Sequence, residues 1–548
     1  MKTMIISLLA FSSVAFAAAT VCDVRDYGAS GNGSTKDTQA IQKAIEACAQ
    51  KAGVVYFPPG KYLTGAITLR SNITLHIEAG ATLLGSPDAA DYPMVPNPWR
   101  PETTTISALI YGDGVKNVTL TGLGTIDGQG LTWWNRAFIW RRSPEYESRE
   151  RRYTPLVEMC SSTPSMNTAL FYPPRQLERP AAAGPQAGLR ESPRPRLFTC
   201  VRCTNLLMEG LTVRNSPNWT INPVFSEQLV FRGLTIDAPI DSPNTDLFDL
   251  ESCRNVLISD CTMDGGDDLV TIKSGTEPAG LRVNRPCENI TVTNCTMMHG
   301  HGAIVFGSET SGGIRNVSVS NCVFRGTDRG FRLKSQRGRG GVVDGLVASN
   351  IVMEDVYEPF RIHFYYSSPS RTATCRPIQA ANGDSAQPVG EGTPVWRNFS
   401  FDHILAKGAI TAGFILGLPE SPMSGMTFSN VRIWAKDEGF LCRYAKDVAF
   451  HNVQFNTGAG SALVARNTDG LEIDGFQTAE PHAEVPVIDL NSITDVLLRG
   501  SWAARGTGTF VNVSGDSTRN VVLNGNELRY AKQAVNVAKE AAKEVRVQ

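Results

Sequence analysis

Four short motifs hold the side chains of this 548-residue chain that are best suited to chemistry. Carboxylates in one cluster push one another's pKa values apart, so one can keep a proton as a general acid while others stay ionised as bases. Hydrolysis of a glycosidic bond needs this division of labour. A guanidinium and an ammonium two residues apart can also pair with the carboxylate of an anionic sugar. The motifs are Asn244-Thr245-Asp246, Gly266-Asp267-Asp268, Gly300-His301-Gly302 and Arg332-Leu333-Lys334.

A recurring apolar phrase must position these motifs. Each copy is rich in β-branched residues, alternates like a short strand and is followed by Gly, Asn or Asp at a turn. Successive copies lie 22 to 34 residues apart, except for one gap of 53, and this period fits one coil per repeat. The anchors of the copies are Leu206, Leu229, Val256, Ile290, Val317, Leu346, Phe399, Met426, Val448, Leu471, Val496 and Val521.

Asparagine and cysteine recur at fixed offsets from these anchors. The asparagines fall four residues after the anchor, which predicts the same left-handed turn in each coil, and the cysteines fall five after it. Equal offsets on adjacent coils should stack about 4.8 Å apart, as strands do in a parallel sheet. We therefore predict an all-β, single-domain, right-handed parallel β-helix. A leucine-rich repeat is disfavoured because the phrases are rich in Val, Ile and Thr and have no helical half. The stacked residues are Asn294, Asn321, Asn350, Asn430 and Asn452, with Cys261, Cys295 and Cys322.

The ends and interruptions of the stack can also be predicted. The β-helix domain is expected over residues 18–530, with a helix between 37 and 52 capping its N-terminal end. Segments 141–196 and 367–393 have no strand period and are expected to be loop insertions. The charged, Ala-rich segment 531–548 is predicted to be a helical tail.

The N-terminus has the features of a secretory signal peptide over residues 1–17. Lys2 precedes an apolar stretch from Met4 to Val14, and Ala15-Phe16-Ala17 is a small-residue cleavage site. We expect a secreted, extracellular protein without a membrane partner, since no later segment is apolar enough to span a bilayer. The net charge of -1 argues against bulk capture of a polyanion such as nucleic acid, so local cations must hold an anionic substrate. Candidate glycosylation sites are Asn32, Asn72, Asn117, Asn218, Asn398 and Asn512.

The charged motifs fall at matching offsets from the anchors. Asp267 lies 11 residues after Val256 and His301 lies 11 after Ile290, so the two should stack on adjacent coils. A lone Gly-Asp-Asp is most often a turn, but its arrival in order with the other motifs on successive coils favours chemistry. Asp249, Asp264 and His299 lack this alignment and are expected at turns or on other faces. The remaining aligned residues are Asp246 and Lys334, at an offset of 17, and Asp268, at an offset of 12.

In this order the motifs resemble those of glycoside hydrolase family 28, the polygalacturonases and related pectin hydrolases. The resemblance continues through Ile272-Lys273-Ser274-Gly275 and the segment 307–313, and it reaches residues 23–29 near the N-terminus. It covers nearly all of the chain apart from the insertions. The resemblance implies hydrolysis of α-1,4-galacturonosidic bonds in polygalacturonate or pectin, with inversion at the anomeric carbon.

The same resemblance implies a role for each site residue. Asp267 would be the general acid, while Asp246 and Asp268 would hold and deprotonate the attacking water. His301 would support the protonation of the acid or the position of the substrate. No cofactor and no metal is implied, and the expected partner is an anionic pectic polysaccharide or oligosaccharide bound by a monomer. The implied substrate-binding residues are Arg332, Lys334 and Asn244.

One departure from the family pattern and several alternatives remain. The family usually continues Asn-Thr-Asp with Gly and a β-branched residue, whereas Leu247-Phe248 is expected here to alter the turn and narrow the groove. The sequence leaves open whether cleavage is internal or terminal. It also leaves open another pectic backbone, such as rhamnogalacturonan or xylogalacturonan. The other classes are a calcium-dependent pectate lyase and a non-catalytic carbohydrate-binding β-helix.

Overall fold

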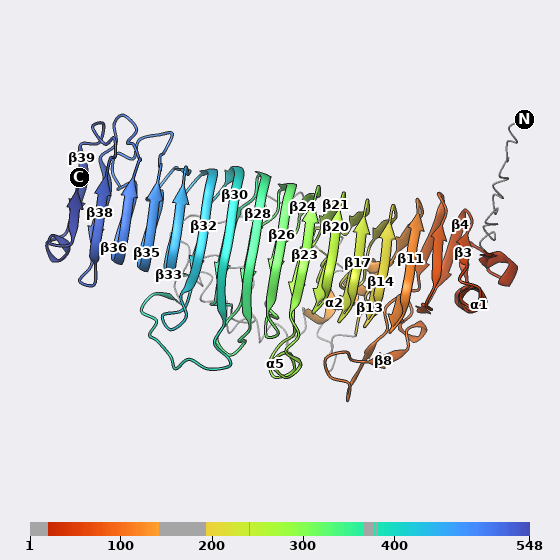
Figure 1. Ribbon diagram of the computed structural model, residues 1–548. Coiled ribbons are helices and arrows are strands. Elements are labelled where there is room, and N and C mark those ends of the chain that lie inside the picture. The colour runs from red at the N-terminus through yellow and green to blue at the C-terminus, as the bar shows by residue number, and fades with distance from the viewer. Residues whose placement is uncertain (1–19, 142–192, 241, 367–377, 379–380) are drawn as a thin grey trace, which may run out of the picture.

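The chain winds into an elongated stack of coils with its N-terminal and C-terminal segments at opposite ends (Figure 1). The computed structural model describes residues 20–141, 193–240, 242–366, 378 and 381–548. The predicted signal peptide, most of the first insertion and much of the second lie outside these residues. Among the described residues, thirty-eight strands join into one system whose pairings are parallel, and the separate pair β8 (Met94–Pro96) and β9 (Thr104–Ile106) is antiparallel. The predicted right-handed parallel β-helix is confirmed.

The coils stack their strands in three columns, and several long strands continue from one column into the next. The first column contains β5 (Ile67–Thr68), β10 (Ile110–Asp113), β13 (Phe198–Val201), β16 (Ile221–Val224), β19 (Phe248–Glu251), β22 (Asp268–Lys273), β25 (Gly302–Phe306), β27 (Arg329–Lys334), β29 (Glu358–His363), β31 (Gly413–Leu416), β33 (Phe440–His451), β35 (Leu463–Asp474), β36 (Ile488–Arg499), β37 (Thr509–Ser514) and β39 (Gln533–Val537). The second contains β1 (Val21–Asp23), β3 (Val54–Phe57), β6 (Ile73–Ile77), β11 (Lys116–Gly122), β14 (Thr204–Glu209), β17 (Glu227–Arg232), β20 (Arg254–Ser259), β23 (Cys287–Thr293), β26 (Ile314–Arg325), β28 (Val342–Glu354), β30 (Val395–Ala409), β32 (Met423–Ala435), β38 (Arg519–Asn524) and β40 (Val545–Val547). The third contains β2 (Asn32–Lys36), β4 (Gly60–Thr64), β7 (Ala81–Gly85), β12 (Thr125–Asp127), β15 (Thr212–Arg214), β18 (Thr235–Asp237), β21 (Thr262–Gly265), β24 (Thr296–His299) and β34 (Gln454–Thr457).

A single apolar core runs along the inside of the stack. Strands of the second column alternate buried and exposed residues, so each coil turns one apolar face inward. The inward side chains of successive coils touch along the axis. Phe331 stacks on Phe360, with ring centroids 5.7 Å apart, and Phe401 stacks on Phe428 at 5.0 Å. Burial of this continuous core is the main force that holds the coils together.

The predicted asparagine turns are confirmed. Asn294, Asn321, Asn350, Asn430 and Asn452 all have left-handed backbones, with φ between 51° and 57°. Their side chains bridge adjacent coils: Asn350 donates to Asn321 at 3.2 Å, and Asn452 donates to Asn430 at 2.7 Å. Asparagine tolerates this conformation better than most residues because its short amide can hydrogen-bond locally. The cysteine stack is present as well, since the buried thiol of Cys295 contacts those of Cys261 and Cys322.

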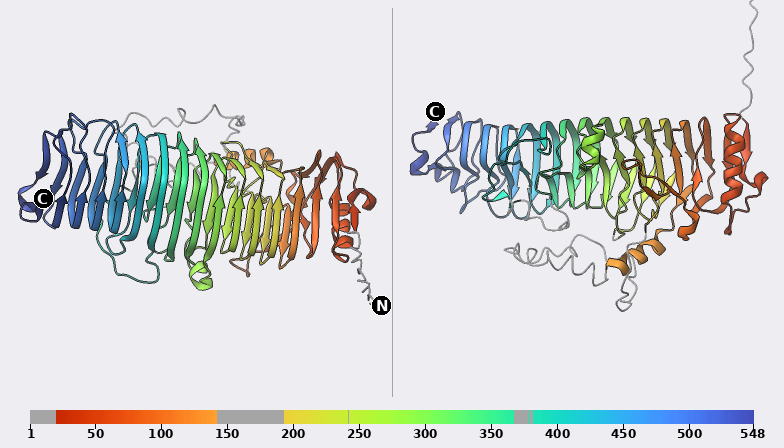
Figure 2. Two further views of the ribbon diagram at one scale, coloured as in Figure 1. Left: turned by 45° about the horizontal axis from the view of Figure 1, so that its top comes forward. Right: turned by 90° about the horizontal axis from the view of Figure 1, so that it is seen from below.

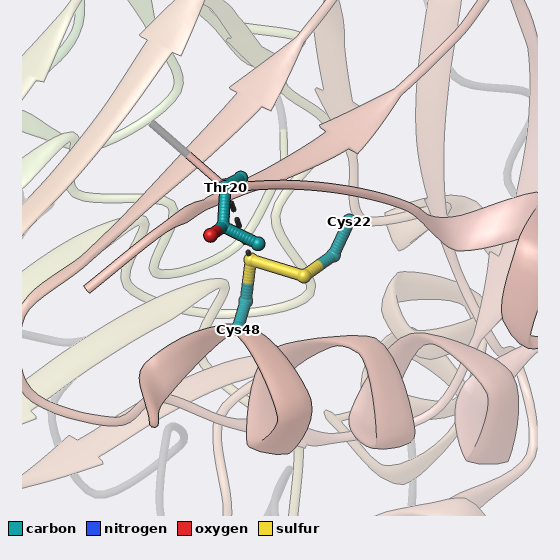
Figure 3. The surroundings of a disulfide bond; sticks show 3 residues. All are labelled: Thr20, Cys22 and Cys48. Atoms are coloured by element: carbon teal, nitrogen blue, oxygen red, sulfur yellow. Dashed lines mark hydrogen bonds between the residues drawn. A yellow bond between two sulfur atoms is a disulfide. The ribbon is translucent and has the colours of Figure 1, made fainter. Parts of the chain in front are cut away.

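The predicted N-terminal cap is a helix, α1 (Thr38–Ala49), at the end of the stack (Figure 2). Its buried side chains, Ile41, Ala44, Ile45 and Cys48, recur at helical spacing, as an amphipathic helix requires. A disulfide joins Cys48 to Cys22 in β1, with the two Cα atoms 6.0 Å apart (Figure 3). The cap therefore covers the apolar end of the first coils and is covalently tied to them.

The prediction of a helical tail over 531–548 is wrong. This segment forms β39 and β40 around a short 3₁₀ turn at Lys539–Ala541, and both strands pair in parallel with the preceding coil. Val535 pairs with Val511 and packs on the core. Ala, Lys and Glu are good helix formers, but intrinsic helix propensity is small per residue, and pairing with the coil beneath outweighs it.

Several short elements lie outside the three columns. They are the 3₁₀ turns at Val24–Tyr27 and Ala89–Asp91, the helix α2 (Gly130–Arg141) and the one-turn helix α5 (Ala279–Val283). In the described part of the second insertion, residues 378 and 381 are helical, and residues 382–393 contain neither helix nor strand. Among the described residues, no helix combines the length and apolarity needed to cross a bilayer.

Candidate active site

The four motifs meet in one cleft on the outer side of the first column. Asp246 precedes β19, Asp267 precedes β22, Asp268 begins β22, His301 precedes β25, and β27 carries the two cations. These strands are consecutive neighbours in the column. The cleft has a volume of about 260 Å³. It is lined by all seven residues predicted from the sequence: Asn244, Asp246, Asp267, Asp268, His301, Arg332 and Lys334.

Asp267 and His301 form an ion pair across adjacent coils. The Nδ1 atom of His301 lies 2.9 Å from Oδ1 of Asp267, as their equal offsets predicted. Burial alone would raise the pKa of Asp267, but the charges of His301, Arg332 and Lys334 outweigh burial and lower it. Burial likewise opposes the charged form of His301, yet Asp267 raises its pKa. In the unliganded cleft the pair therefore carries its proton mainly on the imidazole.

Asp268 is held by both cations of the Arg-Leu-Lys motif. Arg332 Nη1 donates to Oδ1 at 2.6 Å and Lys334 Nζ donates to Oδ2 at 2.8 Å. Burial opposes ionisation of this carboxyl group, but the two cations outweigh it and lower the pKa of Asp268 to about 2. Asp268 is thus a fixed anion at any pH at which the protein would normally work, and both of its oxygen atoms are occupied.

Asp246 has the opposite electrostatic environment. It is buried, and its Oδ1 atom has no hydrogen-bond partner among the described residues. Burial and the nearby carboxylates of Asp249, Asp267 and Asp268 raise its pKa, although Lys273 works in the other direction. Of the three predicted carboxylates, Asp246 is therefore the one that binds a proton most strongly in the unliganded cleft.

Lys273 and Asp249 are site residues that the sequence analysis did not identify. Asp249 was expected at a turn or on another face, but it lies within β19 and is fully buried. Its Oδ1 atom is 2.5 Å from Nζ of Lys273, which lines the cleft. The ammonium of Lys273 also lies 3.7 Å from the ring centroid of Trp219. The position of Lys273 in a segment that matches the family pattern was the available signal.

Asn244 is held at the edge of the cleft by Arg194, which the sequence analysis also did not identify. Arg194 is buried, and its Nη2 donates to Oδ1 of Asn244 at 2.9 Å. Its Nη1 donates to the carbonyl oxygens of Pro217 and Pro243, at 2.8 and 2.6 Å. Arg194 therefore joins three backbone segments beside the carboxylates. Its location at the end of the first insertion gave no hint of this role.

The expected effect of Leu247-Phe248 on the groove is not found. Both side chains are fully buried, and the amide of Leu247 donates to the carbonyl oxygen of Asp268 at 3.0 Å. Gly265 provides the space for Leu247. A Cβ atom added at Gly265 would lie 3.3 Å from Leu247 and 2.6 Å from the side chain of Leu269. The bulky pair thus packs beneath the cleft and does not narrow it.

Asp264 and His299 lie on the third column, as expected for residues on another face. The Nδ1 atom of His299 is 2.8 Å from Oδ1 of Asp264, and neither residue lines the cleft. This pair resembles Asp267 and His301 in composition but stands in β21 and β24, away from the cations of β27. It therefore offers a matched comparison for the cleft pair.

The donor set of the cleft does not fit a metal ion. Asp267, Asp268 and His301 each place a donor atom within 4.8 Å of the others. However, both oxygen atoms of Asp268 bind cationic side chains, and Nδ1 of His301 faces Asp267. Arg332 and Lys334 at this distance would repel a divalent cation. The arrangement is suited instead to acid–base chemistry by side chains.

Comparisons with known proteins agree with this geometry. The model of glycosyl hydrolases family 28 matches residues 184–382, which include the seven predicted residues, and a rhamnogalacturonase A/epimerase, pectate lyase-like model matches residues 21–90. The "Probable polygalacturonase" of Vitis vinifera is 28% identical over 79% of this chain and 78% of its own length. The exo-poly-alpha-D-galacturonosidase of Dickeya chrysanthemi is 28% identical over 75% of this chain and 71% of its own.

A solved structure extends the likeness to most of the coil stack. The hyperthermoactive exopolygalacturonase of Thermotoga maritima is 30% identical, with a TM-score of 0.61, over 79% of this chain and 91% of its own. The family model covers the cleft, and this structure covers most of the β-helix around it. The chain therefore belongs to glycosyl hydrolase family 28.

Proposed function

We propose that this family 28 enzyme hydrolyses the α-1,4-galacturonosidic bonds of polygalacturonate and pectin, with inversion at the anomeric carbon. The observation that carries the proposal is the single cleft in which three carboxylates lie beside Arg332 and Lys334. Arg332 and Lys334 each donate one hydrogen bond to Asp268, and a guanidinium has five N–H donors and an ammonium three. The donors that remain can bind a galacturonate carboxylate in a bidentate or charge-assisted manner.

The Asp267–His301 pair supplies the proton for the leaving group. When a substrate carboxylate pairs with Arg332 and Lys334, it offsets part of the positive charge that lowers the pKa of Asp267. The proton can then pass from Nδ1 of His301 to Asp267 along their 2.9 Å contact. Asp267 donates it to the glycosidic oxygen as the bond to the anomeric carbon breaks. His301 thus stores the proton that the general acid delivers.

Asp246 is the stronger base for the attacking water. A base works best when its pKa lies near the working pH, and the pKa of Asp246 is raised whereas that of Asp268 is lowered to about 2. Water bonds to the anomeric carbon on the face opposite the leaving group, and its proton passes to Asp246. Asp268 orients that water and fixes the two cations that bind the substrate.

The same proposal includes export and domain organisation. Residues 1–17 act as a signal peptide, and the rest of the chain forms one β-helix domain, which β39 and β40 extend beyond residue 530, with 141–196 and 367–393 as loop insertions. The mature protein is a secreted monomer. The net charge of -1 supports substrate capture by local cations in the cleft, without nucleic acid or membrane partners.

Asp267→Asn tests the hydrolase assignment. The amide cannot deliver a proton, so release of reducing ends from polygalacturonate should fall by about 10²- to 10⁴-fold, while the thermal unfolding midpoint changes little. Asp264→Asn is the matched control, because it alters the equivalent Asp–His pair outside the cleft. Unchanged turnover in Asp267→Asn would contradict the hydrolase assignment and favour a carbohydrate-binding protein. Calcium-dependent formation of unsaturated, ultraviolet-absorbing products would identify a lyase instead.

Arg332→Met tests the choice of an acidic sugar. Loss of a charged hydrogen bond of about 1.5–3 kcal/mol should lower kcat/KM for polygalacturonate by roughly 10- to 100-fold. The effect should be much smaller on methyl-esterified pectin, whose carboxyl groups are neutral. Arg325→Met, which removes an exposed arginine paired with Glu354, is the control. Equal losses on both polymers would favour another pectic backbone. Products sampled from the start of digestion distinguish internal cleavage from removal of terminal sugars.

A further inference from the structure

A buried ion pair lies directly behind Asp246. Lys273, at the end of β22, has a side chain that is 5% exposed, and that of Asp249 in β19 is 0% exposed. The Nζ atom of Lys273 is 2.5 Å from Oδ1 of Asp249 and 3.8 Å from Oδ2 of Asp246. The ring of Trp219 covers the same ammonium at 3.7 Å. The ammonium of Lys273 therefore lies near two carboxylates. It is closer to Asp249, which does not line the cleft, than to Asp246, which does.

The contacts fix this arrangement. The carboxylate of Asp249 has no donor other than the ammonium of Lys273 among the described residues, since neither Oδ1 nor Oδ2 accepts a further hydrogen bond. Removing one partner of a buried ion pair leaves an uncompensated charge, which is strongly unfavourable. Asp249 therefore keeps the ammonium of Lys273 at 3.8 Å from Oδ2 of Asp246. The other charged groups that act on these residues are Asp267 and Asp268 on Asp246, Glu251 and Arg196 on Asp249, and Glu309 on Lys273.

We propose that the Asp249–Lys273 pair is a positioning unit that sets the protonation state of Asp246 during hydrolysis. Lys273 holds enough positive charge near Asp246 for it to be ionised when water is activated. Asp249 holds Lys273 back, so that Asp246 remains basic enough to accept the proton. The role assigned to Asp246 rests on the proposed function of the cleft, whereas the electrostatic coupling of the three groups does not.

The two partners should have opposite effects when they are neutralised. In Lys273→Met the nearby positive charge is lost, so the pKa of Asp246 rises and the acid limb of kcat/KM moves to higher pH, by about 1–3 units. In Asp249→Asn a like charge is lost and the ammonium is released toward Asp246, so the limb moves to lower pH, by about 1 unit. Lys273→Arg keeps the charge and should largely restore the wild-type limb.

The pH dependence of kcat/KM on polygalacturonate should be measured for these three variants and the wild type. Lys446→Met, which removes an exposed lysine paired with Asp469, is the control and should leave the profile unchanged. A purely structural pair would lower activity or stability in both neutralised variants without moving the limb. The proposal would be overturned if the acid limb of kcat/KM did not shift in Lys273→Met and Asp249→Asn, or if it shifted in the same direction in both.

A second measurement does not depend on turnover. The carboxyl carbon of Asp246 can be titrated by ¹³C NMR in protein labelled at aspartate, with Asp246→Asn identifying its resonance. The pKa of Asp246 should rise in Lys273→Met and fall in Asp249→Asn. If the wild type releases no reducing ends, the proposed function fails, but the NMR titration still decides whether the pair controls Asp246.

Discussion

In the cleft, Asp267 and His301 share one proton and have oppositely displaced pKa values. Because the pKa of Asp267 is lowered, its contribution to stability is present above the ordinary carboxyl value of about 4 and is lost as the pH falls through the lowered value. Because the pKa of His301 is raised, its contribution is present below about 6.5 and is lost as the pH rises through the raised value. The pair therefore stabilises the fold most between about pH 4 and 6.5.

His301→Asn should shift the alkaline limb of activity. In the wild type, activity falls when the Asp267–His301 pair loses its proton, and the raised pKa of His301 places this loss above the ordinary imidazole range. Without the imidazole, the proton must reside on Asp267 itself, so the alkaline limb should move to lower pH by about 1 unit or more. The measurement is the pH profile of kcat. His299→Asn is the control, and a profile unchanged by His301→Asn would contradict the proton-storage role.

At the scale of single elements, the strands that carry the site differ from those of the second column in how they are buried. Every residue of β19, β22 and β27 is buried. The strands of the second column show the usual alternation of buried and exposed residues. The polar side chains of the site are therefore desolvated, which strengthens each charge–charge interaction described above.

The contrast between fully buried strands and strands with one exposed face decides what could be predicted from sequence. The repeat period, the asparagine turns and the offsets of Asp267 and His301 predicted the fold and the main cleft residues, because they follow from one coil per repeat. The buried position of Asp249 could not be predicted, since alternation is informative only where one face of a strand is solvated. The tail at 531–548 was mispredicted because composition reports local helix preference, whereas pairing with the last coil is a long-range contact.

Asn430→Ala tests the contribution of one asparagine turn. Asn430 has φ of 54°, donates to Asp402 at 2.9 Å and accepts from Asn452 at 2.7 Å. Loss of these bonds and of local support for the left-handed backbone should lower the free energy of unfolding by about 2 kcal/mol. Asn430→Gly should be about 1 kcal/mol less harmful, because glycine adopts this conformation readily. Equal losses in the two variants would contradict the backbone argument, and Thr427→Ala on the same strand is the control.

At the scale of the whole molecule, the β-helix is a one-dimensional stack whose coils contact only their neighbours. Stability in such a stack is close to a sum of coil and interface contributions, and the terminal units must cover the apolar ends. Helix α1 covers the N-terminal end, where Ile41, Ala44 and Ile45 are buried. At the other end, β39 and β40 cover β37 and β38. The site lies between these two ends and depends on the regularity of the coils that carry it.

Removal of residues 531–548 should expose the coil formed by β37 and β38. Val511, Val513 and Leu523 are at most 1% exposed in the intact chain, and the backbone edges of both strands pair with the deleted segment. Unpaired strand edges with apolar side chains promote association between chains. We expect a lower thermal unfolding midpoint and oligomers on size-exclusion chromatography, with kcat per folded chain retained. Lys543→Ala, an exposed substitution in the same segment, should remain monomeric with an unchanged midpoint. A monomeric truncated chain with the wild-type midpoint would show that these strands do not cap the stack.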